Sequence, residues 1–176
     1  MAQEKRKKKF FDVELPLINQ ETQLQAFEIS ELDGRIISYD LTRMLKGKSM
    51  LLQMSVKMED GKPVTRAIQM KLLPYFLRRM VRKGTNYVED SFTAQAKDAK
   101  ITVKPFMVTR RKVSRTIRKA LRDKAREDIT NYFKSKNSEE IFDETIRGTI
   151  QKQLGMSLKK IYPLSLCEIR ILRVEK

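Results

Sequence analysis

The sequence predicts an α+β fold: an antiparallel β-sheet or partly closed barrel built from hairpins, followed by two main helices and a C-terminal strand. Apolar and polar residues alternate with period two over much of residues 10–108, which is typical of strands with one buried face. Two Asp-Gly pairs, at residues 33–34 and 60–61, indicate tight hairpin turns in this region. From Lys112 the apolar period becomes that of a helix. We therefore expect a basic tail at residues 1–9 and a single α+β domain at residues 10–176.

The first half of the domain is expected to be mostly strand. Residues 22–29 and 35–41 are predicted to be strands joined by the first Asp-Gly pair. Residues 50–58 and 64–72 are predicted to be strands joined by the second pair. Two such hairpins within a short stretch favour an antiparallel sheet.

A short helix is predicted at residues 74–83. Pro74 stands at its start, where a missing N–H costs nothing, and Gly84 follows its end. Two further strands are predicted at residues 87–94 and 100–109. Pro105 lies inside the second, so that strand is expected to be an edge strand or to carry a bulge.

The second half is predicted to be helical. Residues 112–134 and 138–153 follow the helical period, and Ser138 is the expected N-cap of the second helix. Gly148 is expected to weaken that helix without breaking it. Residues 163–174 then alternate again and are predicted to form the final strand.

The composition excludes several kinds of chemistry. The chain has no histidine, so a Ser-His-Asp triad, a histidine base and a histidine-ligated metal are all excluded. The one cysteine, Cys167, cannot form an intramolecular disulfide, and we expect it to be a buried small apolar residue. No phosphate-cradling glycine motif is present, no apolar run is long enough for a membrane helix, and no secretory signal is expected. We expect an intracellular protein that is not an enzyme and that needs no cofactor and no metal.

The charge indicates a polyanionic partner. Lys and Arg number 38 against 22 Asp and Glu, which gives a formal net charge of +16 and a pI of about 10.0. So large an excess repels itself in the compact state, and an opposite charge on a partner relieves that repulsion. Nucleic acid is the leading candidate and an anionic membrane surface is the second.

An arginine stripe on the first main helix is the clearest binding candidate. At about 100° per residue, its members fall within a sector about 80° wide. They are Arg111, Arg115, Arg118, Arg122 and Arg126. The side with Val113, Ile117 and Ala120 lies nearly opposite and is expected to be buried. An ordinary solvated face is the alternative, but it would mix signs, whereas arginine suits bidentate binding of phosphate.

Three further basic clusters are candidate RNA-binding residues. They are the tail (Lys5, Arg6, Lys7, Lys8, Lys9), the end of the short helix (Arg78, Arg79, Arg82, Lys83) and the junction before the stripe (Arg110, Arg111, Lys112). The tail is either simply solvated or an arm that lies on phosphates, and we expect it to be mobile in the free protein and ordered beside RNA. Base readout by stacking has little support, because the chain has no Trp and no strand with a paired-aromatic pattern.

Four segments of the sequence resemble one ribosomal protein family. They are Lys-Phe-Phe-Asp-Val-Glu-Leu-Pro at residues 9–16, Leu-Asp-Gly-Arg-Ile at 32–36 ahead of Asp-Leu-Thr-Arg at 40–43, Val-Thr-Arg-Arg-Lys-Val-Ser-Arg-Thr-Ile-Arg at 108–118 and Lys-Ile-Tyr-Pro-Leu at 160–164. In order and spacing the chain is similar to the archaeal and eukaryotic small-subunit ribosomal protein family S1e, also called S3Ae. It departs from the family in having Phe-Phe where Trp-Tyr is usual and in a shortened loop after Pro16. It also lacks the long C-terminal extension of eukaryotic members, so an archaeal-type member is expected.

The resemblance implies a structural constituent of the small ribosomal subunit in the cytoplasm. Family members lie on the platform near the mRNA exit, bind small-subunit rRNA and neighbouring ribosomal proteins, and support translation together with mRNA and initiation factors. Residues 10–176 would then be an rRNA-binding domain without a membrane partner. The alternatives are a free-standing basic RNA- or DNA-binding factor, then an RNA-modifying enzyme, then a membrane-surface protein.

Overall fold

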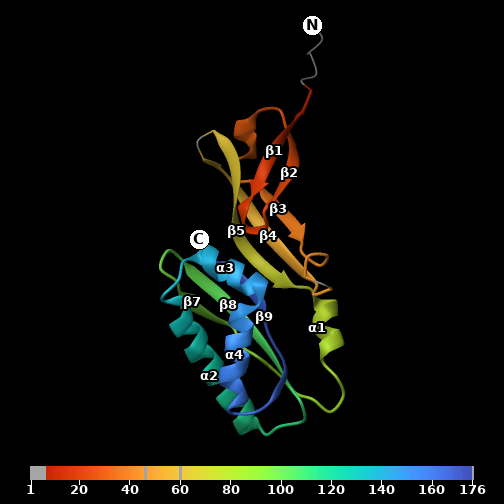
Figure 1. Cartoon of the computed structure of the whole chain (residues 1–176), viewed down its shortest axis with the longest axis vertical. Coiled ribbons are helices and arrows are strands. Elements are labelled where there is room, and N and C mark those ends of the chain that lie inside the picture. Colours follow the sequence, from red (N-terminus) through yellow and green to blue (C-terminus); the bar gives the residue numbers. More distant parts are fainter. Residues whose placement is uncertain (1–6, 46, 60, 176) are drawn as a thin grey trace. The chain divides into compact units, whose positions relative to one another are not determined.

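The computed structural model describes residues 7–45, 47–59 and 61–175 (Figure 1). The chain divides into two compact units. Unit 1 comprises the chain up to Tyr39 together with Gln53–Ile68, and unit 2 comprises Asp40–Leu52 together with the chain from Gln69 onward. The expected single domain at residues 10–176 stays a prediction.

Unit 1 is built around a hairpin of β1 (Lys9–Leu15) and β2 (Gln20–Ala26). The two strands pair antiparallel, and the 3₁₀ turn η1 (Pro16–Ile18) connects them. A small core forms from Val13, Ala26, Leu32 and Val56, with Phe11, Leu24 and Ile37 packed against it. Glu14 of β1 pairs in parallel with Val64 of β5 (Lys62–Leu72), so the sheet is mixed and mostly antiparallel.

The first predicted hairpin is wrong. A 3₁₀ turn, η2 (Ile29–Leu32), follows β2, and β3 (Ile36–Asp40) pairs with β4 (Met50–Glu59) instead of with β2. Gly34 does adopt a turn conformation with φ +75°, but its N–H donates to the carbonyl of Val56 at 2.9 Å. An Asp-Gly pair favours a turn locally, whereas the burial of apolar faces decides which strands pair. The second predicted hairpin is confirmed, because β4 and β5 pair on either side of residues 60–61.

Unit 2 contains the strands β6 (Tyr87–Glu89), β7 (Phe92–Gln95), β8 (Lys100–Thr109) and β9 (Leu164–Val174). β8 pairs antiparallel with β9 on one side and with β6 and β7 on the other. The single strand predicted at residues 87–94 is therefore two short strands. Of the two alternatives for Pro105, the bulge is confirmed, because the β8–β9 register shifts between Lys104 and Pro105 of a central strand.

The strand order as a whole is β2-β1-β5-β9-β8-β6, with β3 and β4 beside β5 and β7 beside β8. Among the described strands, β2 and β6 stand at the two ends of this order and do not pair with each other. The predicted α+β class is confirmed in its open-sheet form, and the sheet is not a closed barrel.

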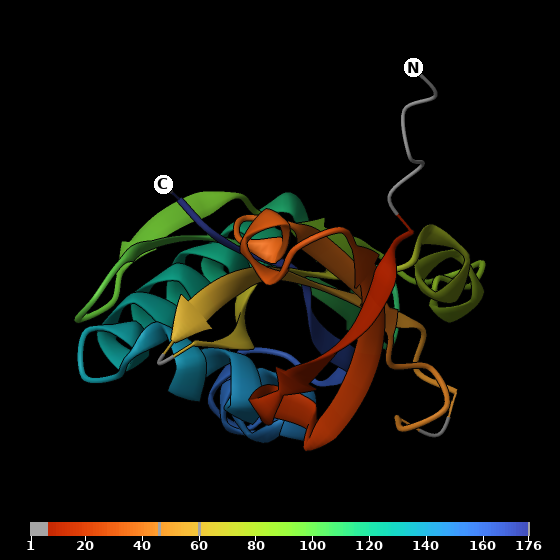
Figure 2. The ribbon, with the colours of Figure 1, turned by 90° about the horizontal axis from the view of Figure 1, so that it is seen from above.

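Four helices belong to unit 2 among the described residues. They are α1 (Pro74–Met80), α2 (Arg115–Phe133), α3 (Ser138–Arg147) and α4 (Thr149–Lys159). α1 ends three residues earlier than predicted, because Val81 is already extended. α2 packs on α4, β6 and β7, and α3 and α4 pack on each other and on β9 (Figures 1 and 2).

The second main helix is broken where it was expected only to be weakened. Gly148 adopts φ +81°, ends α3 and donates its N–H to carbonyls of the last helical turn. The N-cap is Asn137 and not Ser138: a capping box joins Asn137 to Glu140. Glycine is the residue that adopts this left-handed conformation without strain, and it allows α4 to leave in a new direction.

We expect Gly148→Ala to lower the free energy of unfolding by about 1–2 kcal/mol, since an L side chain is strained at this φ. Gly155→Ala is the matched control. Gly155 lies inside α4, and a Cβ there would meet the Cβ of Cys167 at an ordinary 3.8 Å. This control should be neutral or should stabilise the protein by up to about 1 kcal/mol. Urea unfolding measures both, and equal effects of the two substitutions would contradict this account of Gly148.

Candidate nucleic-acid interface

The helix that carries the arginine stripe begins at Arg115. Ser114 is its N-cap, and the Ser114 hydroxyl oxygen accepts a hydrogen bond from the backbone N–H of Ile117 at 3.4 Å. Arg111 therefore lies before the helix, in a bend, and the helix predicted at residues 112–134 begins three residues later than expected. The serine cap fixes this boundary, since its extended backbone cannot continue the helix toward Arg111.

The buried face of α2 differs from the predicted one. Its fully buried row is Leu121, Ala125, Ile129 and Phe133, at steps of four residues. Ala120 is exposed, and Val113 and Ile117 are only half-buried, so the predicted buried side is corrected. Four residues turn a helix by about 400°, so such a row drifts by about 40° at each step around the helix. The predicted buried side was taken from residues near the start of the helix, so it does not follow this drift along the later turns.

Because the buried row turns around the helix, the arginines of the stripe differ in their exposure. Arg115 and Arg122 remain exposed, whereas Arg118 is half-buried. The Nε of Arg118 is buried and has no hydrogen-bond partner among the described residues, so its donor capacity is not used within this part of the chain. A hollow of about 520 Å³ lies here, and its lining is Arg115, Thr116, Arg118, Lys119, Arg122 and Asp123.

Lys119 lines the same hollow, and the sequence analysis did not select it as a binding residue. It follows Arg115 by four residues, so the two side chains share one face of α2. The spacing of four residues that relates the arginines of the stripe also relates this lysine to Arg115.

Arg126, the last residue of the stripe, has an ion-pair partner within the chain. Its guanidinium donates to both carboxylate oxygens of Asp90, at 2.9–3.1 Å, and lies 5.4 Å from the ring centre of Phe92. Asp90 stands between β6 and β7. This contact ties α2 to the sheet edge, and it compensates the charge of Arg126 locally.

The cations at the start of α2 are unfavourable for the helix itself. The N-terminal end of a helix carries a partial positive charge, so nearby acids stabilise it and nearby cations do not. The first turn of α2 has no acidic residue, and Arg115 is its first residue. The first backbone N–H groups of a helix also lack partners inside it, which makes this end suited to an anion.

The junction residues Arg110, Arg111 and Lys112 are all exposed. Arg110 shares a hollow with Lys152 and Lys159 of α4, two cations that the sequence analysis did not select. Lys152 and Lys159 are seven residues apart and so lie on one face of α4, a spacing that the sequence does contain. The structure therefore extends the basic junction onto α4.

The third cluster lies at and after the end of α1. Arg78, Arg79, Arg82 and Lys83 are exposed, while Phe76 and Leu77 are buried beneath the helix. Met80 and Val81 are half-buried.

The basic tail belongs to unit 1. Lys5 and Arg6 lie outside the described residues. Lys7, Lys8 and Lys9 are exposed; Lys9 is the first residue of β1, and the Nζ of Lys8 lies 5.6 Å from the ring centre of Phe27.

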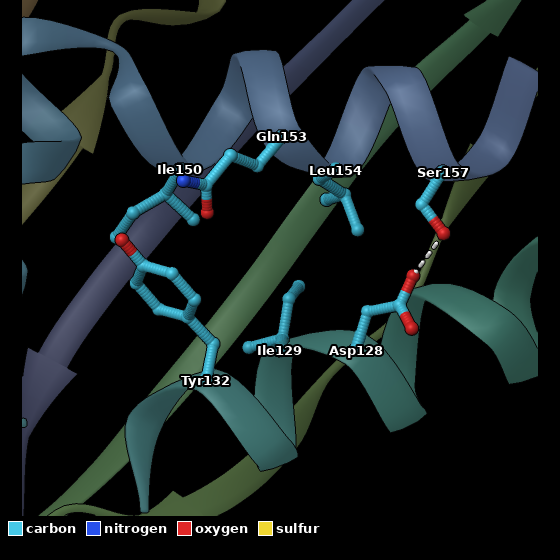
Figure 3. A pocket seen from close by; sticks show the side chains of 7 residues that line it. All are labelled: Asp128, Ile129, Tyr132, Ile150, Gln153, Leu154 and Ser157. Carbon is cyan, nitrogen blue, oxygen red and sulfur yellow. Dashed lines mark hydrogen bonds between the residues drawn. The ribbon is translucent and has the colours of Figure 1, made fainter. Parts of the chain in front are cut away.

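Another hollow lies between α2 and α4 and has a different character (Figure 3). Its volume is about 230 Å³, and Ile129 and Tyr132 of α2 face Ile150 and Leu154 of α4 across it. Asp128 accepts a hydrogen bond from Ser157 at 2.6 Å and pairs with Lys124 at 3.1 Å. The lining contains no arginine or lysine, so this hollow is not suited to phosphate.

The described residues bear on two other function classes, metal-binding proteins and membrane-spanning proteins. No group of three or more acidic or sulfur side chains is arranged to hold a metal ion in this part of the chain. No described helix is long and apolar enough to cross a bilayer.

Cys167 lies on β9, opposite Met107 of β8. It was expected to be buried and is half-buried. Loss of solvent around the sulfur, followed by the negative charge of Glu168, raises the pKa of the thiol to about 12. The thiol is therefore protonated at neutral pH, which suits a structural residue and not a nucleophile.

The geometry describes a basic α+β protein whose exposed arginines suit the backbone of a nucleic acid. Residues 2–176 match the Ribosomal S3Ae family, and the chain belongs to that family of ribosomal proteins. The resemblance in the sequence is thereby confirmed, and membership of this structural family agrees with the expectation of a non-catalytic protein.

Several archaeal proteins named small ribosomal subunit protein eS1 are similar to this chain. The protein of Saccharolobus islandicus is 25% identical over 96% of this chain and 85% of its own length. The protein of Methanothermobacter thermautotrophicus is 31% identical over 60% of this chain and 54% of its own length. The protein of Halorubrum lacusprofundi is 30% identical over 63% of this chain and 52% of its own length. The matches thus span about half of two relatives and most of the third.

The raised pKa of Cys167 predicts slow alkylation. At pH 8 the folded thiol holds far less thiolate than an unfolded one, whose pKa is near 9.0. Lower thiolate content outweighs the higher intrinsic nucleophilicity of a basic thiol, so we expect iodoacetamide to react at least about tenfold more slowly with folded protein than with protein in urea. Mass spectrometry follows the reaction. Equal rates in the two states would refute the prediction.

Proposed function

We propose that this protein is a structural constituent of the small ribosomal subunit that binds rRNA through its basic surfaces and supports translation. The observation that carries rRNA binding is the set of exposed cations around the start of α2 that have no ion-pair partner among the described residues. We call this set the α2 basic surface, and its members are Arg110, Arg111, Lys112, Arg115, Lys119 and Arg122.

The mechanism is neutralisation of phosphate. Each phosphate contact releases counterions from the RNA, and that release drives binding without reading the base sequence. Arginine is suited to the task because its planar guanidinium stays charged and can donate two parallel hydrogen bonds to one phosphate. Closely packed RNA segments and protein neighbours could then dock where the phosphates are neutralised.

The resemblance to the family supports a finer placement within this proposal. The relatives are named as small-subunit proteins. The family resemblance supports a position on the platform near the mRNA exit, in the cytoplasmic ribosome. Partners would be small-subunit rRNA and neighbouring ribosomal proteins, with mRNA and initiation factors nearby and no membrane. The residues that contact RNA would be those of the α2 basic surface, the α1 cluster (Arg78, Arg79, Arg82, Lys83), the tail (Lys5 to Lys9) and the remaining arginines of the stripe (Arg118, Arg126).

In a lysate of its own cells, the protein should sediment with the small ribosomal subunit at high Mg²⁺ concentration. Sedimentation and immunodetection in a sucrose gradient, at high and low Mg²⁺, measure this. A large free pool at high Mg²⁺ would instead favour a free-standing nucleic-acid-binding factor.

The α2 basic surface can be tested by replacing Arg111, Arg115 and Arg122 with Gln. All three are exposed, so the fold should be kept within about 0.5 kcal/mol per site. Binding to a small-subunit rRNA fragment should weaken across sequences. The slope of log affinity against log salt should fall by about 2–3, since each lost phosphate contact removes about 0.7–0.9.

A matched triple variant separates a local effect from a change in total charge. Replacing Arg43, Arg66 and Arg147 with Gln removes the same charge from exposed positions outside the proposed surfaces. The salt slope of this control should stay near that of the wild type. Equal slopes for the two triple variants would mean that the α2 basic surface does not contact phosphate.

A further inference from the structure

One hollow of unit 2 combines aromatic and cationic side chains. It lies between the α1 segment and the strands β6, β8 and β9, and its volume is about 560 Å³. Leu77, Val81 and Phe106 give it apolar walls. Arg78 and Arg170 are its two cations.

Tyr87 is the most exposed aromatic side chain of this hollow. It stands on β6, a three-residue strand that pairs with β8, and 55% of its surface is exposed. Its ring stacks on Phe106 with centres 5.9 Å apart and planes inclined by 21°. Phe106 is itself buried, so the pair is a fixed aromatic platform reaching from the core toward solvent.

The charges around the platform are arranged unequally. Arg170 donates to both carboxylate oxygens of Glu89, at 2.9 and 3.0 Å, so these two charges compensate each other inside the hollow. Arg78 is exposed and makes no ion pair with the described residues, and Arg82 and Lys83 follow it along the chain. The charges of Arg170 and Glu89 therefore cancel beside the aromatic pair, whereas the positive charge of Arg78 in the lining stays uncompensated.

This combination suits a group that is aromatic and planar at one end and anionic at the other. A bare phosphate would gain nothing from Tyr87, and an apolar peptide segment would gain nothing from Arg78. A nucleotide of single-stranded RNA uses both, because its base can stack on an aromatic ring while its phosphate binds an arginine.

We infer that this hollow binds one unpaired base of RNA, which stacks on Tyr87 while Arg78 contacts the adjoining phosphate. The inference rests on the proposed RNA binding and adds a single-stranded element to it. Stacking tolerates every base, so the site recognises an unpaired nucleotide and not a sequence.

The test compares two probes of equal charge on the full-length protein. One is single-stranded octaadenylate, and the other is an eight-unit abasic phosphodiester of the same length. Tyr87→Leu should weaken octaadenylate binding by about 5- to 150-fold and leave the abasic probe unaffected, because stacking supplies about 1–3 kcal/mol per base. Tyr87→Phe should bind octaadenylate within about twofold of the wild type, because the ring is kept.

The matched control is Tyr75→Leu. Tyr75 lies on α1 and is also 55% exposed, but it is not part of the hollow. It should not change the affinity for either probe. Circular dichroism and thermal unfolding show whether each variant is folded. If Tyr87→Leu is unstable, Tyr87→Phe still decides the question. Stacking is excluded if Tyr87→Phe binds the abasic probe as tightly as it binds octaadenylate.

The outcomes separate this inference from the proposed function. If the wild type binds both probes equally, or if Tyr87→Leu and Tyr75→Leu act alike, the stacking site is overturned while salt-dependent RNA binding stands. If the wild type binds neither these probes nor the rRNA fragment, the proposed function fails as well.

Discussion

The buried row of α2 is the constraint on which the rest of unit 2 depends. Leu121, Ala125, Ile129 and Phe133 are the residues that α2 buries completely. Full burial of a large apolar side chain is worth about 1.5–3 kcal/mol, so this row fixes the rotation of the helix about its own axis. Once the rotation is fixed, the direction of every other side chain on α2 follows, including the arginines.

Chemically identical arginines of unit 2 have different surroundings. Arg126 is held by Asp90 at the sheet edge, and Arg170 is held by Glu89 on β6. Arg115 and Arg122 make no ion pair with the described residues. Paired arginines connect elements of the fold, whereas unpaired ones leave positive charge uncompensated. An exposed ion pair contributes little to stability, so the more important effect is on where positive charge remains uncompensated.

The uncompensated charge has a cost in the free protein. Arg115 and its neighbours stand at the end of α2 where the helix dipole disfavours cations, by about 0.3–1 kcal/mol for each charge. A phosphate at the same place reverses the sign of the interaction, because it attracts both the arginines and the free N–H groups of the first turn. The arrangement is therefore better suited to the bound state than to the isolated chain.

The sequence by itself determined the α+β class, the second hairpin, the order of the strand-rich and helical halves, and the presence of basic clusters at α1 and α2. Those features depend on local periodicity, on turn residues and on composition, which a sequence contains in full. The tertiary structure decided that β3 pairs with β4, that Gly148 ends α3, and that Ala120 is exposed. It also decided that Arg126 meets Asp90 and that Tyr87 meets Phe106. These outcomes depend on which faces are buried together and on contacts between residues far apart in the chain, and local patterns do not encode them.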